Sequence, residues 1–159
     1  MLHIRLIAPG NLKESYWRAA VAEYEKRLSA YAKLEIIELK EYRLQESPAP
    51  AEIEVALEKE ADAILALIPP RSFTVALCVE GNQLSSEELA SKLSLVMQES
   101  GSLTLIIGSS HGLASRVKKA AAMRLSVSKL TFPHQMMRVL LLETVYRSLS
   151  ILHGAKYHK

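Results

Sequence analysis

Several features that define other protein classes are absent from this sequence of 159 residues. Cys78 is its single cysteine, so an internal disulfide cannot form, and its apolar neighbours predict a buried small hydrophobe. No apolar run reaches the roughly 18–20 residues that span a bilayer. Residues 1–14 lack the basic stretch and the cleavage site of a secretory signal. We therefore expect a cytoplasmic protein with no membrane partner.

Acidic residues are scarce in the last third of the chain. Glu143 is the one acid after residue 110, where nine Lys and Arg residues lie, whereas residues 1–110 carry 16 acids and 11 bases. Such an imbalance indicates either a polyanionic partner or a solvated basic face. Binding to a polyanion through phosphate contacts would weaken as the salt concentration rises.

Segments typical of strands alternate with segments typical of helices along the whole chain. This order predicts an α/β fold in one domain, 1–159, with a mainly parallel sheet and helices on both faces. Ser85 and Glu88 form a capping box at one helix start. The expected strands are 2–8, 33–40, 72–81, 102–108 and 123–128, and the expected helices are 13–31, 53–68, 85–98, a short one near Gly112 and a last one from Pro133.

Three loops follow strands of this predicted sheet, after Leu77, Ile107 and Val127. Ligands of parallel sheets bind at the carboxyl ends of the strands, so we expect a site there. The second loop, Gly108 to Gly112, also matches the G-x-S-x-G pattern of hydrolase nucleophiles. The only acid downstream is Glu143, which is spaced to pair with Arg147, so a hydrolase is the weaker reading.

The last helix has two unusual features. His134 and Arg138 lie near its start, where the helix dipole attracts anionic groups, although His134 would equally suit a histidine that caps or packs locally. Apolar residues cover its circumference, which requires burial by a dimer partner or by threading through the fold. His153 and His158 have no Cys or Asp nearby, so we expect no metal site.

Several motifs resemble one known family. EYEKRL (23–28), VEG (79–81), GSSHG, SKLTFPHQMMRV (128–139), ETVYR (143–147) and the terminal YHK are similar to the RlmH family of ribosomal RNA methyltransferases, in the SPOUT superfamily. The resemblance implies a homodimer with a C-terminal trefoil knot. It also implies that S-adenosylmethionine donates a methyl group to N3 of a pseudouridine, in helix 69 of 23S rRNA on assembled ribosomes.

The resemblance also implies which residues contact the cofactor. The family usually carries two glycines where this chain has Gly108 and Ser109, so Ser109 would be strained if that position needs a positive φ. The matching cofactor positions are Leu77, Gly108, Val127, Ser128, Lys129, Leu130, Thr131 and Phe132.

The terminal Tyr157-His158-Lys159 offers a ring that stacks on a base, a titratable imidazole and a phosphate-binding ammonium. We predict catalytic roles for Tyr157 and His158, with the tail of one subunit completing the partner's site. Lys129 and Lys159 are expected to contact RNA with His134 and Arg138. Two alternatives remain open: a SPOUT enzyme with another RNA target, and a ribosome-binding protein without catalysis.

Overall fold

The computed structural model describes residues 1–157 and contains one five-stranded sheet in which every neighbouring pair of strands is parallel. The order is β2-β1-β4-β3-β5, so β4 is inserted between two strands that precede it in the chain. The predicted α/β class is confirmed. The strands are β1 (Leu2–Pro9), β2 (Ala32–Leu39), β3 (Phe73–Asn82), β4 (Ser102–Ile106) and β5 (Met123–Leu125).

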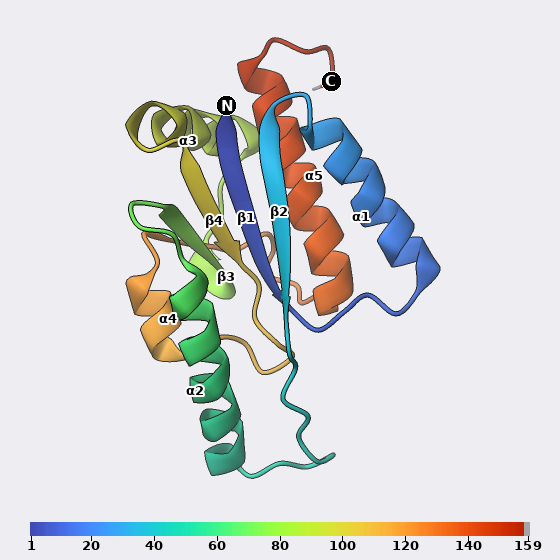
Figure 1. The fold of residues 1–159 in the computed structure, drawn as a ribbon, viewed down its shortest axis with the longest axis vertical. Helices are drawn as coiled ribbons and strands as arrows, with labels where there is room; N and C mark the ends of the chain where they lie inside the picture. Colours follow the sequence, from blue (N-terminus) through green and yellow to red (C-terminus); the bar gives the residue numbers. More distant parts are fainter. Residues whose placement is uncertain (158–159) are drawn as a thin grey trace.

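Five helices flank this sheet on both of its faces (Figure 1). The expected elements are all present, and their ends shift by a few residues. Both β4 and β5 are shorter than expected, because residues 107–114 and 126–133 leave the sheet as loops. The helices are α1 (Ser15–Leu28), α2 (Pro50–Leu67), α3 (Ser86–Glu99), α4 (Ser115–Ala120) and α5 (His134–Leu152).

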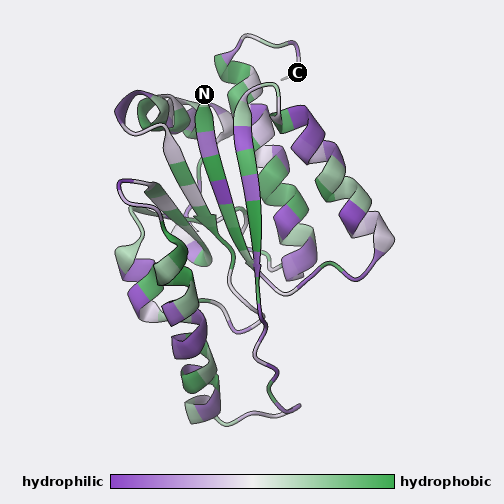
Figure 2. Cartoon of the chain, viewed as in Figure 1, coloured by the Kyte–Doolittle hydropathy of each residue, from purple (hydrophilic) through white to green (hydrophobic). Residues whose placement is uncertain are grey.

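Alternation along β1 divides the core between the two faces of the sheet. Leu2, Ile4 and Leu6 point to the face that α1, α3 and α5 cover, whereas Ile7 packs with α2 and α4 on the other. Hydrophobic residues concentrate in the strands and α5, and polar ones dominate α1 (Figure 2). None of the helices within residues 1–157 has the length and apolar content that crossing a bilayer requires.

Local sequence signals set the helix starts. The predicted capping box of α3 is confirmed, since the amide of Glu88 donates to Ser85 Oγ (3.1 Å) and the amide of Ser85 donates to the Glu88 carboxylate (2.7 Å). Pro50 begins α2 and Pro133 immediately precedes α5, positions where a missing amide hydrogen has no consequence. Pro133 thereby ends the loop 126–133 at a defined point.

Helix α5 lies between α1 and α3, against the sheet. Its buried residues include Leu141, Leu142, Val145 and Leu149, so much of its apolar circumference is covered within one chain. A strip on its outer side is half-buried; it contains Met136, Leu140, Thr144 and Ile151. The fold itself therefore meets part of the need for burial on every side, and this strip and the exposed Leu152 remain available to a partner.

Candidate active site

A pocket of about 600 Å³ lies at the carboxyl ends of β3, β4 and β5. We call it the carboxyl-end pocket. The three loops expected from the sequence form its walls, because the ends of parallel strands meet at one edge of the sheet. Lys129, predicted to contact a cofactor, is exposed and does not line it. The other predicted residues all do: Leu77, Gly108, Val127, Ser128, Leu130, Thr131 and Phe132.

Gly108 allows the second loop to fold tightly on itself. A Cβ at Gly108 would lie 2.5 Å from the carbonyl oxygen of Gly112, closer than real atoms approach. The turn is closed by the amide of Gly112, which donates to the carbonyl of Ser109 (2.9 Å). Ser109 is not among the residues with positive φ, so serine is unstrained where the family usually has a second glycine.

Serine side chains shape the third loop. The Ser126 hydroxyl donates to the carbonyl of Ser128 (2.9 Å), and the amide of Leu130 donates to Ser128 Oγ (3.0 Å). The amide of Ser126 bonds to the carbonyl of Asn82 (2.9 Å), which ties the loop to the end of β3. Such local bonds fix the loop's backbone before any ligand binds.

His134 contributes an unsatisfied polar atom to the pocket. Its Nδ1 is buried and has no hydrogen-bond partner among the described residues, although His134 lines the pocket. The amino end of α5 beside it has no side-chain cap. Because buried polar atoms are nearly always bonded, this arrangement fits a ligand that supplies the missing partner.

Cys78 was expected to be buried, but the structure leaves it partly exposed. It is half-exposed and lines the carboxyl-end pocket beside Glu80, at the point where β3 passes out of the core. Burial is the main cause that raises the pKa of the Cys78 thiol, and the nearby Glu80 carboxylate adds to it. The side chain therefore stays a neutral thiol around pH 7.

Comparison with known families agrees with this geometry. A family model described as "Predicted SPOUT methyltransferase" matches residues 2–158, nearly the whole chain. The chain belongs to the SPOUT methyltransferase family. SPOUT methyltransferases generally act on RNA and use S-adenosylmethionine. The carboxyl-end pocket of this SPOUT protein fits S-adenosylmethionine. Gly108 has no side chain to block the backbone, and His134 Nδ1 lacks a hydrogen-bond partner that a ligand could supply.

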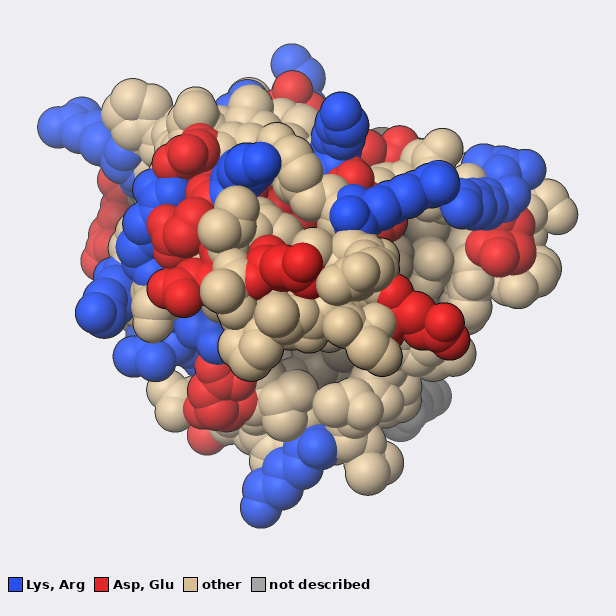
Figure 3. Space-filling model, turned by 90° about the horizontal axis from the view of Figure 1, so that it is seen from below, with Lys and Arg blue, Asp and Glu red and all other residues tan. Residues whose placement is uncertain are grey.

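The basic last third of this SPOUT methyltransferase is partly neutralised by acids from earlier residues. Basic and acidic side chains are interspersed over the face of the molecule seen in Figure 3. Within residues 1–157, Lys119, Arg124 and Lys129 are exposed and make no ion pair. The paired cations are Arg116 with Glu58 and Asp62, Lys118 with Glu80, Arg138 with Glu38, and Arg147 with Glu143.

Arg138 is buried, whereas the RNA contact predicted from the sequence requires an exposed side chain. It is 1% exposed, and its guanidinium donates to the Glu38 carboxylate (2.7 Å) and to the carbonyls of Pro9 and Gly10 (3.2 Å each). The side chain instead joins the ends of β1 and β2 to α5. Its partners lie at least 100 positions away in the sequence, so residue spacing gave no sign of them.

The end of the chain docks on the middle of α5. Tyr157 Oη donates to the Glu143 carboxylate (3.1 Å), and the Tyr157 ring lies over the Arg147 guanidinium, 4.7 Å from centroid to Cζ. The predicted pair of Glu143 and Arg147 is confirmed at 2.7 Å. Tyr157 does not line the carboxyl-end pocket of its own chain. The predicted residues His158 and Lys159 lie outside the described residues.

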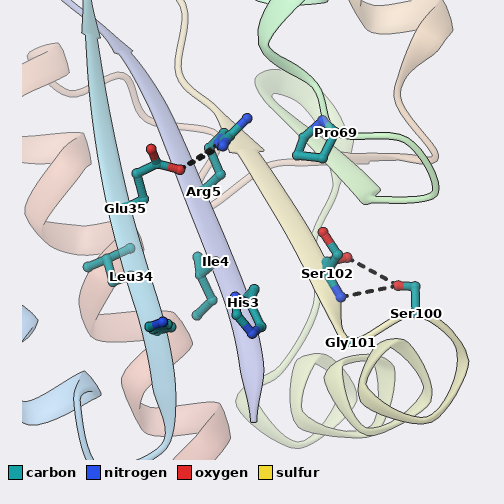
Figure 4. A pocket seen from close by; sticks show the side chains of 10 residues that line it. His3, Ile4, Arg5, Leu34, Glu35, Pro69, Ser100, Gly101 and Ser102 are labelled. Atoms are coloured by element: carbon teal, nitrogen blue, oxygen red, sulfur yellow. Dashed lines mark hydrogen bonds and ion pairs between the residues drawn. The ribbon is translucent and has the colours of Figure 1, made fainter.

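A second, smaller hollow lies at the other end of the sheet, away from the three strand-end loops. This hollow of about 520 Å³ lies at the amino ends of β1, β2 and β4. Figure 4 shows Arg5 and Glu35 pointing toward each other across β1 and β2, and they pair at 2.8 Å. Arg5 also donates to the carbonyl of Leu67 (2.7 Å), so its guanidinium already has protein partners and is not available to bind an anionic ligand.

The geometry does not support the hydrolase reading either. Ser110 is exposed, and within residues 1–157 it makes no hydrogen bond to a histidine. Glu143, the acid that a triad would need, is held by Arg147 on α5. The same described residues contain no group of three or more His, Cys, Asp or Glu side chains able to hold a metal. His153 instead packs its ring on Tyr31, with a centroid distance of 4.6 Å.

Proposed function

We propose that this chain methylates N3 of a pseudouridine in helix 69 of 23S rRNA, on assembled ribosomes in the cytoplasm, with S-adenosylmethionine as methyl donor. The observation that carries the proposal is the convergence of three strand-end loops on one pocket, with seven of the eight expected residues lining it. The RlmH-like motifs run through the same loops and the tail. Bound S-adenosylmethionine would supply an electrophilic methyl group.

The protein's own contribution is positioning. Gly108 and the serine-shaped loop 126–133 would hold the cofactor, and His134 Nδ1 would gain the hydrogen bond that it lacks. Alignment of reacting groups is worth roughly 7–11 kcal/mol of a barrier. Lys129, exposed beside the pocket, would bind an RNA phosphate rather than the cofactor, together with Lys119 and Arg124.

The target nitrogen carries a proton at neutral pH, so a base or a water path must remove it. We assign this step to His158 and base stacking to Tyr157, with Lys159 on a phosphate. Tyr157 lies away from its own carboxyl-end pocket, so the tail would act on the pocket of a second subunit. The half-buried strip of α5 offers a surface for such a homodimer. The proposal includes the trefoil knot that the resemblance implies.

The decisive test uses ribosomes from cells that lack the protein. Incubation with the purified chain and S-adenosylmethionine should add one methyl group to a pseudouridine of helix 69, as seen by mass spectrometry of the RNA fragment. Protein-free 23S rRNA is the matched control and should remain unmodified. Methylation of a different nucleotide would instead support a SPOUT enzyme with another RNA target.

Calorimetry separates the enzyme from a ribosome-binding protein without catalysis. Ribosome binding without measurable affinity for S-adenosylmethionine would support the ribosome-binding protein without catalysis. The unstrained Ser109 removes the sequence feature that favoured this alternative.

Cys78 provides an independent test of where the cofactor binds. Because Cys78 lines the pocket and is the only cysteine, S-adenosylmethionine at saturating concentration should slow its alkylation by a maleimide about tenfold or more. The raised pKa predicts slow alkylation of the apoprotein at pH 7, with a rate that rises at a higher pH than for a free thiol. Adenosine triphosphate serves as the control ligand. Equal rates with and without S-adenosylmethionine would contradict the assigned pocket.

A further inference from the structure

The carboxyl-end pocket contains one pair of opposite charges that the proposed mechanism does not use. Glu80 lies in β3, past the buried part of that strand, and Lys118 lies on α4; both line the pocket. The Lys118 ammonium donates a hydrogen bond to the Glu80 carboxylate, so the two side chains form an ion pair. Among residues 1–157, no other Lys, Arg, Asp or Glu lines this pocket. Its formal charges therefore lie together, where β3 and α4 meet.

The stability of the fold does not explain why this pair lies in the wall of the pocket. The side chain of Glu80 is 56% exposed and that of Lys118 is 24% exposed. Ion pairs as exposed as this one add little to stability, because water screens the attraction and two long side chains must be ordered. A role in binding a ligand accounts for the position better than a role in holding β3 to α4.

Both side chains keep the capacity to bind a ligand while they are paired. A lysine ammonium has three donor hydrogens and a carboxylate has about four acceptor positions, and the bond between them uses one of each. The hydrogen bond from Lys118 is the main cause that lowers the pKa of Glu80. The carboxylate accordingly stays charged at about pH 7, and the pocket presents a negative and a positive group side by side.

Adjacent charges of opposite sign match an α-amino acid group, in which one carbon carries an ammonium and a carboxylate. S-adenosylmethionine has such a group at one end and an uncharged adenosine at the other. Of the lining residues that the structure describes, those other than the pair are uncharged apart from His111 and His134, so they suit the adenosine. The ion pair is thus the feature of this pocket that suits the amino-acid end.

We propose that Glu80 and Lys118 determine specificity for the amino-acid end of the methyl donor. Glu80 accepts hydrogen bonds from its ammonium, and Lys118 donates to its carboxylate. The inference rests on the proposed function for the identity of the donor. Both new bonds are charge-assisted, which makes them stronger than neutral ones, although exposure to water reduces their effect. Each should be worth about fivefold to tenfold in affinity.

Calorimetry with two unreactive ligands tests the proposal. S-adenosylhomocysteine retains the amino acid, and methylthioadenosine lacks it. The wild type should bind the first at least about tenfold more tightly. Glu80→Gln and Lys118→Met should each weaken binding of S-adenosylhomocysteine about fivefold to tenfold and leave the affinity for methylthioadenosine unchanged. Glu54→Gln on α2 and Lys26→Met on α1 are the matched controls, since both residues are exposed and neither lines the pocket.

A third ligand assigns the role of Lys118. Decarboxylated S-adenosylmethionine lacks only the carboxylate, so it should bind the wild type about fivefold to tenfold more weakly than S-adenosylmethionine does. Lys118→Met should not weaken its binding further, whereas Glu80→Gln should, because the ammonium is still present.

Exchange of the two charges separates ligand recognition from a structural role. The double variant Glu80→Lys with Lys118→Glu keeps an ion pair and should melt like the wild type, but it presents the charges in reverse order. Its preference for S-adenosylhomocysteine over methylthioadenosine should stay as low as in the single variants. A wild-type preference in the exchanged protein, or in either single variant, would overturn the proposal. Absence of wild-type binding to every one of these ligands would overturn the proposed function, and this inference with it.

Discussion

Replacing Gly108 with alanine should reduce the affinity for S-adenosylmethionine by about 100-fold or more and abolish methylation. The added Cβ would lie 2.5 Å from the Gly112 carbonyl oxygen and 2.6 Å from its carbon, so the turn must open. Opening moves the backbone that lines the carboxyl-end pocket, and displacements of about 1 Å at such sites reduce rates about 100-fold. Calorimetry and a methylation assay on ribosomes measure the two effects.

The control for Gly108→Ala is Ser115→Ala at the start of α4, which should bind the cofactor like the wild type because Ser115 is exposed and does not line the carboxyl-end pocket. The added Cβ would also meet Leu113 Cγ at 2.9 Å, and Leu113 belongs to the core between the sheet and α4, so circular dichroism checks that the variant keeps its fold. Wild-type affinity in the folded Gly108→Ala variant would show that this turn does not shape the binding site.

Deletion of residues 157–159 should lower methylation by about 100-fold to 10,000-fold, the range for loss of a general base, while cofactor affinity changes less than about twofold. The described part of the tail lies on α5 and not in its own carboxyl-end pocket, so the deletion leaves that pocket intact. Tyr157→Phe is the milder companion variant. It keeps the ring over Arg147 and removes only the bond to Glu143.

Mixed dimers decide whether the tail acts on its partner. A subunit without residues 157–159 retains the pocket, and a Gly108→Ala subunit retains the tail. Coexpression of the two inactive chains should restore activity, because one site then contains both intact parts. Full activity of the tail-deleted protein would refute the catalytic role, and failure of the mixture to regain activity would refute sharing between subunits.

Local patterns in the sequence were sufficient to predict much of the fold. The capping box at Ser85 and the proline at position 133 act within a few residues, so the starts of α3 and α5 could be predicted, whereas α2 begins at Pro50, before the expected residue 53. The three strand-end loops were predictable as a site, because any parallel sheet brings such ends together. The pair of Glu143 and Arg147 followed from helical spacing alone.

Interactions between distant residues could not be predicted in this way. Arg138 was taken for a surface cation because neither Glu38 nor the carbonyls of β1 can be located from spacing. Cys78 was expected in the core, yet it follows the buried part of β3 and is partly exposed. Glu60 lies on α2 with the exposed Glu54 and Glu58, and its burial comes from packing against other parts of the chain, which the spacing along one helix does not show.

The central place of α5 has a consequence for biosynthesis. The helix that completes the hydrophobic core, with Leu141, Leu142, Val145 and Leu149, is translated after every other helix and strand described here. While it remains inside the synthesising ribosome, α1 and α3 have no helix between them, and Arg138 cannot reach the first strands. Native packing must therefore wait until α5 has left the ribosome, and products terminated before α5 should be recognised as unfolded and degraded.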